Sequence, residues 1–234
     1  MLEGEWKRAD ILVYSETDRT LQTSVGITEG CDSAVFALWP GEYTVAVICN
    51  SPWELETAAL GIYDSLEALS YSLEDEDPQN RLASATGLVT AGGRALLKPR
   101  LLSCEVVLED VNNNMSGYAR LEDPRVWLED VNDEAQILRE TGFRQKETGR
   151  RTEAVPLPCD VGMFTQYPGT RILCFPNDAA EGTATIPRTT FVLECEIGGE
   201  TVQMRGKLPS MGRGGGARVS VSVDSATEYE VKCR

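Results

Sequence analysis

The chain has 234 residues, of which 41% are hydrophobic and 25% charged, and this is the composition of an ordinary globular protein. Its formal net charge is −15, which argues against a surface that binds the phosphates of nucleic acids or anionic lipids. The sequence contains no histidine, so it lacks Ser-His and Cys-His nucleophiles and the commonest general base at neutral pH. The composition therefore argues against catalysis and against a nucleic-acid partner.

Three strand-like runs occupy the first fifty residues. Residues 11–14 form a short continuous apolar run, as expected of a strand covered on both faces, and residues 34–39 form another. Residues 43–49 alternate between two faces. The Pro40-Gly41 pair predicts a corner between the last two runs, because proline pre-sets φ and glycine accepts a positive φ.

A short helical insert is predicted over about residues 51–73. Ser51, Pro52 and Glu54 match a helix N-cap, a proline at the first helical position and a glutamate at the third. The tetrapeptide DSLE at residues 64–67 is a second capping box. We therefore expect one or two short helices between strands.

The second half of the chain again shows strand patterns. Residues 102–108 alternate cleanly, and residues 191–197 repeat the pattern before Gly198-Gly199, which predicts a two-residue hairpin turn. The polar segment 140–153 is the best linker, so we predict a first domain of residues 1–154 and a second of residues 155–234. The expected core residues are Leu12, Val47, Val106 and Leu108 in the first domain and Leu193 in the second.

The seven cysteines include no Cys-x-x-Cys pair, so neither a zinc ribbon nor a redox motif is indicated. Four of them lie in apolar runs, where we expect them to be buried as small hydrophobic residues: Cys49, Cys104, Cys174 and Cys195. Cys159 and Cys233 are a candidate disulfide, although sequence alone does not set connectivity.

One stretch resembles a calcium loop. Asp110, Asn112 and Asn114 match the first three ligand positions of an EF-hand. However, Met115 stands where glycine is required and Leu121 where the bidentate glutamate belongs. We therefore predict no metal site and no cofactor.

The order of the motifs is more informative than any one of them. The strand ADILVYSE precedes the corner LWPGEYTV, the predicted insert leads to Ala85-Thr86-Gly87, and a strand begins at PRLL. RILCFPN and TTFVL then precede the Gly-Gly hairpin. This series resembles the fimbrillin-like superfamily, the subunits of bacterial type V pili and their anchor and tip components, over most of the chain.

The resemblance implies an all-β protein of two tandem transthyretin-like, Greek-key β-sandwich domains with the helical insert. It also implies export of a lipoprotein precursor through the periplasm to the outer membrane, removal of an N-terminal strand, and a place in the fimbrium at the cell surface. Subunits of that family polymerise when a donor strand from one completes the sheet of the next. The implied partners are other pilus subunits and a receptor on a host or bacterial surface, with membrane attachment only through a lipid anchor that this sequence does not contain.

The resemblance also singles out residues near the N-terminus. Arg8, just before the first strand, is the position that matches maturation by cleavage after a basic residue. We expect an assembly groove beside the first strand, because its continuous apolar run needs cover on both faces. The residues expected there are Ile11, Leu12, Val13 and Tyr14.

The C-terminal residues 227–234 allow two interpretations, a donor strand or the last strand of the second sandwich. We favour the last strand, because Tyr229, Val231 and Cys233 have the spacing of an ordinary inward face.

Three classes of function were weighed. The favoured one is a structural, non-enzymatic pilus subunit or adhesin component for cell adhesion. The alternative is a carbohydrate- or protein-binding surface module at a pilus tip or on the outer membrane. Its candidate ligand aromatic is Trp53, which lies beside a loop. Trp39 and Trp127 lie in strand-like runs, which favour core packing. A glycoside hydrolase needs two paired carboxylates, and no spacing in the sequence selects a pair.

Overall fold

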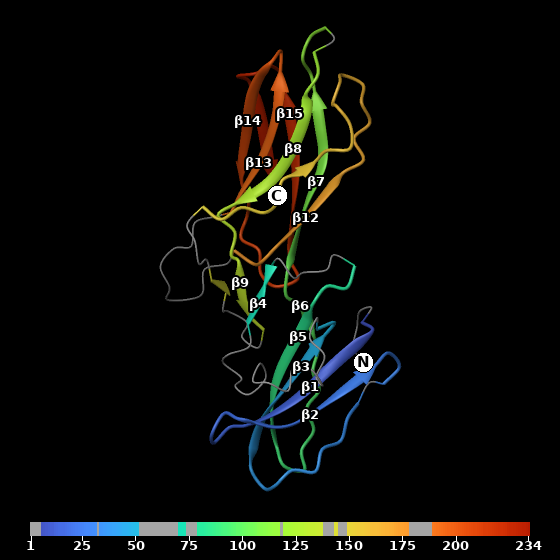
Figure 1. The fold of residues 1–234 in the computed structure, drawn as a ribbon, viewed down its shortest axis with the longest axis vertical. Helices are drawn as coiled ribbons and strands as arrows, with labels where there is room; N and C mark the ends of the chain where they lie inside the picture. The colour runs from blue at the N-terminus through green and yellow to red at the C-terminus, as the bar shows by residue number, and fades with distance from the viewer. Residues whose placement is uncertain are drawn as a thin grey trace. The chain divides into compact units, whose positions relative to one another are not determined.

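The computed structural model divides the chain into two compact units (Figure 1). Unit 1 comprises Met1–Ser103 and Glu134–Arg144, and unit 2 comprises Cys104–Asp133 and Gln145–Arg234. Nearly all regular structure in both units is β-strand, as predicted. The residues that the structure describes are 6–31, 33–51, 70–73, 79–117, 119–137, 149–177 and 189–234, with the backbone of 143–144.

Unit 1 is built on a five-stranded sheet with the order β2-β1-β3-β5-β6 (Figure 1). All neighbouring strands of this sheet are antiparallel. The strands are β1 (Arg8–Ser15), β2 (Leu21–Thr28), β3 (Glu42–Cys49), β5 (Ala83–Thr90) and β6 (Arg100–Leu101).

The register of this sheet sorts its side chains onto two faces. Leu12 lies opposite Ala46, and both are fully buried on one face. Ser84 lies on the same face, and its Oγ donates a 2.6 Å hydrogen bond to the carbonyl oxygen of Ile137. Ile137 directly follows the small three-stranded sheet β10-β9-β4, so this second sheet covers that face. Its strands are β4 (Ser70–Ser72), β9 (Glu134–Gln136) and β10 (Phe143–Arg144).

Asn50 ends β3 and fixes the neighbouring chain segments. Its φ of 58° lies in the left-handed region, which asparagine tolerates better than most residues and which breaks the strand. Its side-chain Oδ1 accepts a hydrogen bond from the backbone N–H of Lys7 at 3.1 Å, and its Nδ2 donates to the carbonyl oxygen of Arg81 at 3.1 Å. One side chain therefore ties the ends of three segments together.

The predicted helical insert is only partly described. Residues 70–72, at the end of the predicted range, form β4 rather than a helix, because Tyr71 is buried where β4 pairs with β9. Residues 52–69, including Trp53, lie outside the described residues.

Unit 2 contains two four-stranded sheets, with the orders β11-β8-β13-β14 and β12-β7-β15-β16. All pairings are antiparallel except that of β15 with β7, which is parallel. The predicted Gly198-Gly199 hairpin joins β13 to β14, and both glycines have a positive φ, of 62° and 83°. The strands are β7 (Cys104–Asn113), β8 (Glu122–Glu129), β11 (Val155–Pro156), β12 (Thr170–Cys174), β13 (Thr190–Ile197), β14 (Glu200–Lys207), β15 (Gly216–Val223) and β16 (Tyr229–Cys233).

The core of unit 2 explains why the chain is not divided at the predicted boundary near residue 154. All five predicted core residues are buried, but Val106 and Leu108 pack in the same cluster as Leu193. The predicted placement of Val106 and Leu108 in the first domain is therefore wrong. The alternation of β7 shows an inward face without showing which strands β7 pairs with, and these neighbours in the sheet are β12 and β15, both in unit 2.

The C-terminal segment forms β16, the last strand of unit 2, as favoured from the sequence. It pairs with β15, and its Val231 and Cys233 side chains pack onto Gly206 of β14. A Cβ atom at Gly206 would lie 2.5 Å from Cγ1 of Val231, so this contact requires glycine.

All seven cysteines are free, and the candidate disulfide between Cys159 and Cys233 is not formed. The four that were predicted to be buried are buried. Burial raises the pKa of the Cys49 thiol to about 12 and that of the Cys195 thiol to about 11, so both stay protonated and unreactive at neutral pH.

We predict that Leu108→Ala and Leu193→Ala each lower the free energy of unfolding of unit 2 by about 2–5 kcal/mol, because both leucines are buried in one core. Hydrogen exchange during denaturant unfolding would locate the effect. Val35→Ala is the control and should change little, because Val35 is 99% exposed. Loss of protection in unit 1 caused by Leu108→Ala would contradict the division into units.

Candidate functional site

The second face of the five-stranded sheet in unit 1 is the floor of an apolar groove of about 700 Å³. The register brings the floor residues together, since Ile11 lies opposite Val47 and Val13 lies opposite Val45. The apolar side chains that β1, β2, β3 and β5 contribute to this floor are Ile11, Val13, Ile27, Val45, Val47 and Val89.

Two segments outside the strands line the groove, and we call residues 33–39 lip 1 and residues 94–99 lip 2. In lip 1 the side chains alternate between half-buried and exposed: Ala34, Phe36 and Leu38 are half-buried, and the residues between them are exposed. In lip 2, Leu97 reaches the floor so closely that a Cβ atom at Gly87 would lie 2.6 Å from its Cδ2. The period of two in lip 1 is the side-chain pattern of a β-strand.

The backbones of both lips nevertheless lack strand partners. In the part of the chain that the structure describes, no backbone–backbone hydrogen bond involves a residue of either lip. The carbonyl oxygen of Trp39 accepts a hydrogen bond from the Tyr43 hydroxyl at 2.8 Å, and that of Ser33 accepts one from the Cys31 thiol at 3.4 Å. Unpaired N–H and C=O groups on a strand-like segment form a template for pairing with another chain.

The two lips run in opposite directions along the groove. The backbone N–H of Ala91 donates to the carbonyl oxygen of Gly41 at 3.0 Å, so the turns at residues 40–41 and 91–92 lie at one end. Lip 1 runs toward this end and lip 2 runs away from it. A strand laid between them would pair antiparallel with one lip and parallel with the other, and both patterns form regular ladders.

The residues predicted for the assembly groove divide between the two faces of β1. Ile11 and Val13 line the groove, whereas Leu12 and Tyr14 are fully buried on the opposite face. A continuous apolar run correctly indicates that both faces are covered, but side chains alternate along a strand, so only every second residue reaches the groove. That the groove serves assembly stays a prediction.

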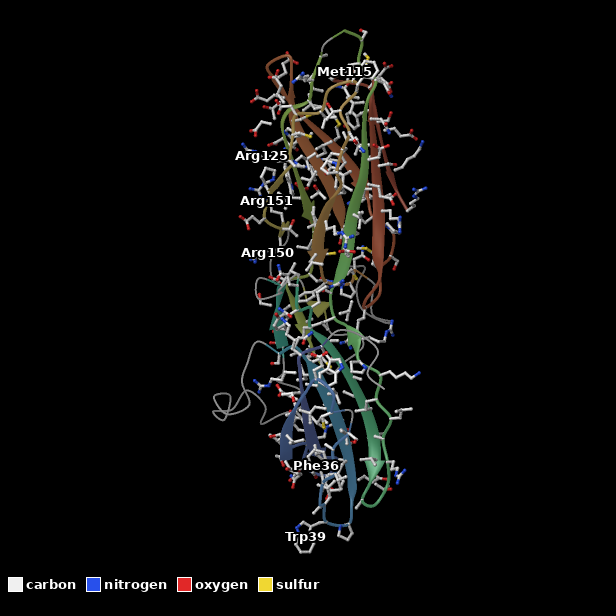
Figure 2. All side chains as sticks on the ribbon, turned by 90° about the vertical axis from the view of Figure 1, so that its right-hand side faces the viewer. Phe36, Trp39, Met115, Arg125, Arg150 and Arg151 are labelled. Atoms are coloured by element: carbon white, nitrogen blue, oxygen red, sulfur yellow. The ribbon has the colours of Figure 1, made fainter. Side chains whose placement is uncertain are left out.

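Sequence reasoning missed the lips. Residues 34–39 were predicted as a strand, and they have strand-like alternation without a ladder. Trp39 was expected in the core, but it is 86% exposed because it falls on the outward side of the alternation. Figure 2 shows Trp39 projecting into solvent at the end of lip 1, beyond Phe36. The alternation of Ala34, Phe36 and Leu38 was the available signal that Trp39 faces outward.

The other tryptophans offer no exposed platform in the described residues. Trp127 is 3% exposed, as expected for core packing, and its Nε1 donates to a Glu129 carboxylate oxygen at 3.1 Å. The Arg151 guanidinium lies over the ring, 5.5 Å from its centroid. Arg151 is labelled on unit 2 in Figure 2.

Arg8, the predicted processing site, begins β1. Its Nε donates to Oδ1 of Asp10 at 3.1 Å, and its carbonyl oxygen accepts a hydrogen bond from the backbone N–H of Asn50 at 2.9 Å. Burial raises the pKa of the Asp10 carboxyl, and Arg8 partly offsets this effect. The peptide bond after Arg8 lies within the sheet, so cleavage there, which stays a prediction, would have to precede formation of β1.

The calcium-like stretch is the end of a strand. Asp110 and Asn112 belong to β7, and Asn112 Nδ2 donates to Oδ2 of Asp110 at 2.7 Å. Among the described residues, no group of three or more acidic or cysteine side chains is placed to hold a metal ion. Within the same residues, none of the helical structure is long and apolar enough to cross a membrane.

We predict that the lip amides exchange with solvent hydrogen much faster than the amides of β1 and β3, because no strand in the described part of the chain pairs with the lips. Residue-resolved hydrogen exchange of the isolated chain measures this directly. Strand-like protection across residues 33–39 and 94–99 would show that the lips are already paired.

No protein-family model matches the sequence, and no curated protein matches it. Solved structures do match. A candidate cell adhesion protein from Parabacteroides distasonis aligns over 100% of this chain and 89% of its own, with 12% identity and a TM-score of 0.72. The tip fimbrial protein Mfa3 from Porphyromonas gingivalis, with a C-terminal truncation, aligns over 99% and 94%, with 13% identity and a TM-score of 0.59. A fimbrial assembly protein from Parabacteroides distasonis aligns over 98% and 87%, with 13% identity and a TM-score of 0.56. The chain therefore has the fold of bacterial fimbrial and cell-adhesion proteins.

Proposed function

We propose that this protein is a structural, non-enzymatic subunit or adhesin component of a bacterial fimbrium, and that unit 1 accepts a β-strand from a neighbouring subunit. The observation that carries the proposal is the apolar groove between two lips whose backbones have no strand partners among the described residues. The fold shared with fimbrial proteins supports it. Location at the cell surface, export through the periplasm and a lipid-anchored precursor belong to the same proposal.

The energetics favour an extended peptide as the ligand. Burying one valine-sized side chain stabilises a complex by about 1.5–3 kcal/mol, and each net hydrogen bond adds about 0.5–1.5 kcal/mol. Association costs about 4–15 kcal/mol in lost freedom. Three buried side chains alone barely offset that cost. A stable complex therefore needs the backbone bonds to both lips as well as the apolar floor.

The composition of the groove argues for a strand over a sugar. Its floor is aliphatic, and its polar lining is limited to Ser33, Thr90 and Arg94. A carbohydrate site needs flat exposed rings and several polar groups. This groove offers mainly aliphatic side chains, with Phe36 half-buried, and lip backbones that are unpaired among the described residues. Binding of carbohydrate or protein at a fimbrial tip stays the alternative, with Trp39 and Phe164 as strongly exposed aromatic residues in the described part of the chain.

We predict that a capped peptide of alternating valine and threonine, as long as lip 1, binds unit 1 and raises its melting temperature equally at low and high salt. The same peptide N-methylated at alternate residues should lose at least about tenfold in affinity, because methylation removes the hydrogen bonds to one lip and leaves the side chains in place. Equal binding of both peptides would show simple apolar adhesion instead of strand pairing.

Two neighbouring residues on β5 provide matched variants for the same measurement. Val89 lines the groove, whereas Leu88 faces away from it and is 74% exposed. Val89→Lys should abolish peptide binding, because a charged side chain would enter the apolar groove, and Leu88→Lys should leave the affinity unchanged. Equal effects of the two substitutions would place the peptide elsewhere on the protein.

A further inference from the structure

Arg94 is the only charged residue among the described residues that line the groove. Its side chain is exposed and takes part in no ion pair or hydrogen bond within the described part of the chain. Although the protein has a net charge of −15, no carboxylate of the described residues pairs with Arg94. The arginines with a carboxylate partner include Arg8, Arg19, Arg125, Arg171, Arg205, Arg218 and Arg234.

The backbone holds Arg94 at a defined end of the groove. Arg94 begins lip 2 immediately after the turn at residues 91–92, where Gly92 has a φ of 80°. At Gly93 a Cβ atom would lie 2.9 Å from the carbonyl oxygen of Thr90, so the chain is tightly packed there. The bond from Ala91 to Gly41 brings the end of lip 1 to the same place. The guanidinium therefore marks one end of any strand that enters.

We propose that the groove selects a donor strand that carries an aspartate or glutamate side chain at the position beside Arg94. This inference rests on strand acceptance by unit 1. Guanidinium and carboxylate form charge-assisted, bidentate hydrogen bonds, and arginine suits this better than lysine because its donors form a fixed planar fork. The preferred partner is thus an extended segment with alternating apolar side chains and a carboxylate at one end.

The negative charge of the whole protein opposes this preference only weakly. At physiological ionic strength the Debye length is about 8 Å, so distant carboxylates are largely screened from a strand in the groove. Arg94 lines the groove itself, so a strand in the groove would approach Arg94 more closely than it approaches the distant carboxylates. Local attraction therefore decides which strand fits, while the net charge disfavours unspecific association of acidic copies.

The test uses the capped peptide of alternating valine and threonine, in which the valines face the groove floor and the threonines face outward. In three variants, glutamate replaces the first, the central or the last threonine. Because both ends are capped, only the side-chain carboxylate is varied. One of the two terminal glutamate peptides should bind about three- to tenfold more tightly than the parent, and lysine at that position should weaken binding. The central glutamate should have little effect. The parent peptide with a free C-terminal carboxylate tests whether a chain end can bind Arg94 in place of a side chain. If it binds more tightly than every glutamate peptide, the proposal that Arg94 selects an aspartate or glutamate side chain is overturned.

Two variants on lip 2 identify the cation. Arg94→Gln should reduce the ratio of the affinities for the glutamate peptide and the parent peptide to about one, and Arg94→Lys should retain part of that ratio. Lys98→Gln is the matched control, because Lys98 is exposed on the same lip but does not line the groove. Binding of the parent without any glutamate preference, or equal effects of Arg94→Gln and Lys98→Gln, would overturn this inference alone. Failure of every peptide to bind would contradict strand acceptance itself.

Discussion

In unit 1, β1 carries apolar side chains on both faces of its sheet, so both faces need cover if they are not to meet water. The face with Leu12 and Tyr14 is fully buried, and the small sheet with β9 lies over it at Ser84. The face with Ile11 and Val13 lies under two lips. Lip 1 has a strand-like side-chain pattern, and neither lip has a backbone–backbone hydrogen bond among the described residues. This unequal cover creates both an apolar floor and free hydrogen-bonding groups, and the proposed function depends on the two together.

The two units differ in how complete their strand pairing is. In unit 2 the C-terminal segment is already paired as β16 and seals its contact with Gly206, so no part of it is free to leave without opening the core. In unit 1 the lips provide pairing sites that the described residues of the chain do not fill. Unit 2 therefore uses its C-terminal segment within its own sheet, and the proposed acceptance of a strand concerns unit 1.

Local patterns were predictable from the sequence where neighbouring residues determine the outcome. The Gly198-Gly199 hairpin, the buried cysteines and the buried leucines follow from turn chemistry and period-two alternation. The domain boundary was not predictable, because the parallel pairing of β7 with β15 joins segments far apart in the chain. The lips could not be recognised for a related reason. Side-chain alternation in residues 34–39 is the same whether or not a ladder partner exists, and the isolation of Arg94 becomes visible only when its surroundings are known.

The central claim is that the groove accepts a strand through both lips. Isotope-filtered nuclear magnetic resonance of the unlabelled valine–threonine peptide bound to the labelled protein tests it most directly. If the strand enters as proposed, cross-strand nuclear Overhauser effects will join the peptide backbone to the backbones of residues 33–39 and 94–99, and the valine methyl groups will contact Ile11, Val13 and Val45. Backbone contacts to the edge strand β2 alone, or methyl contacts without backbone contacts to either lip, would contradict it.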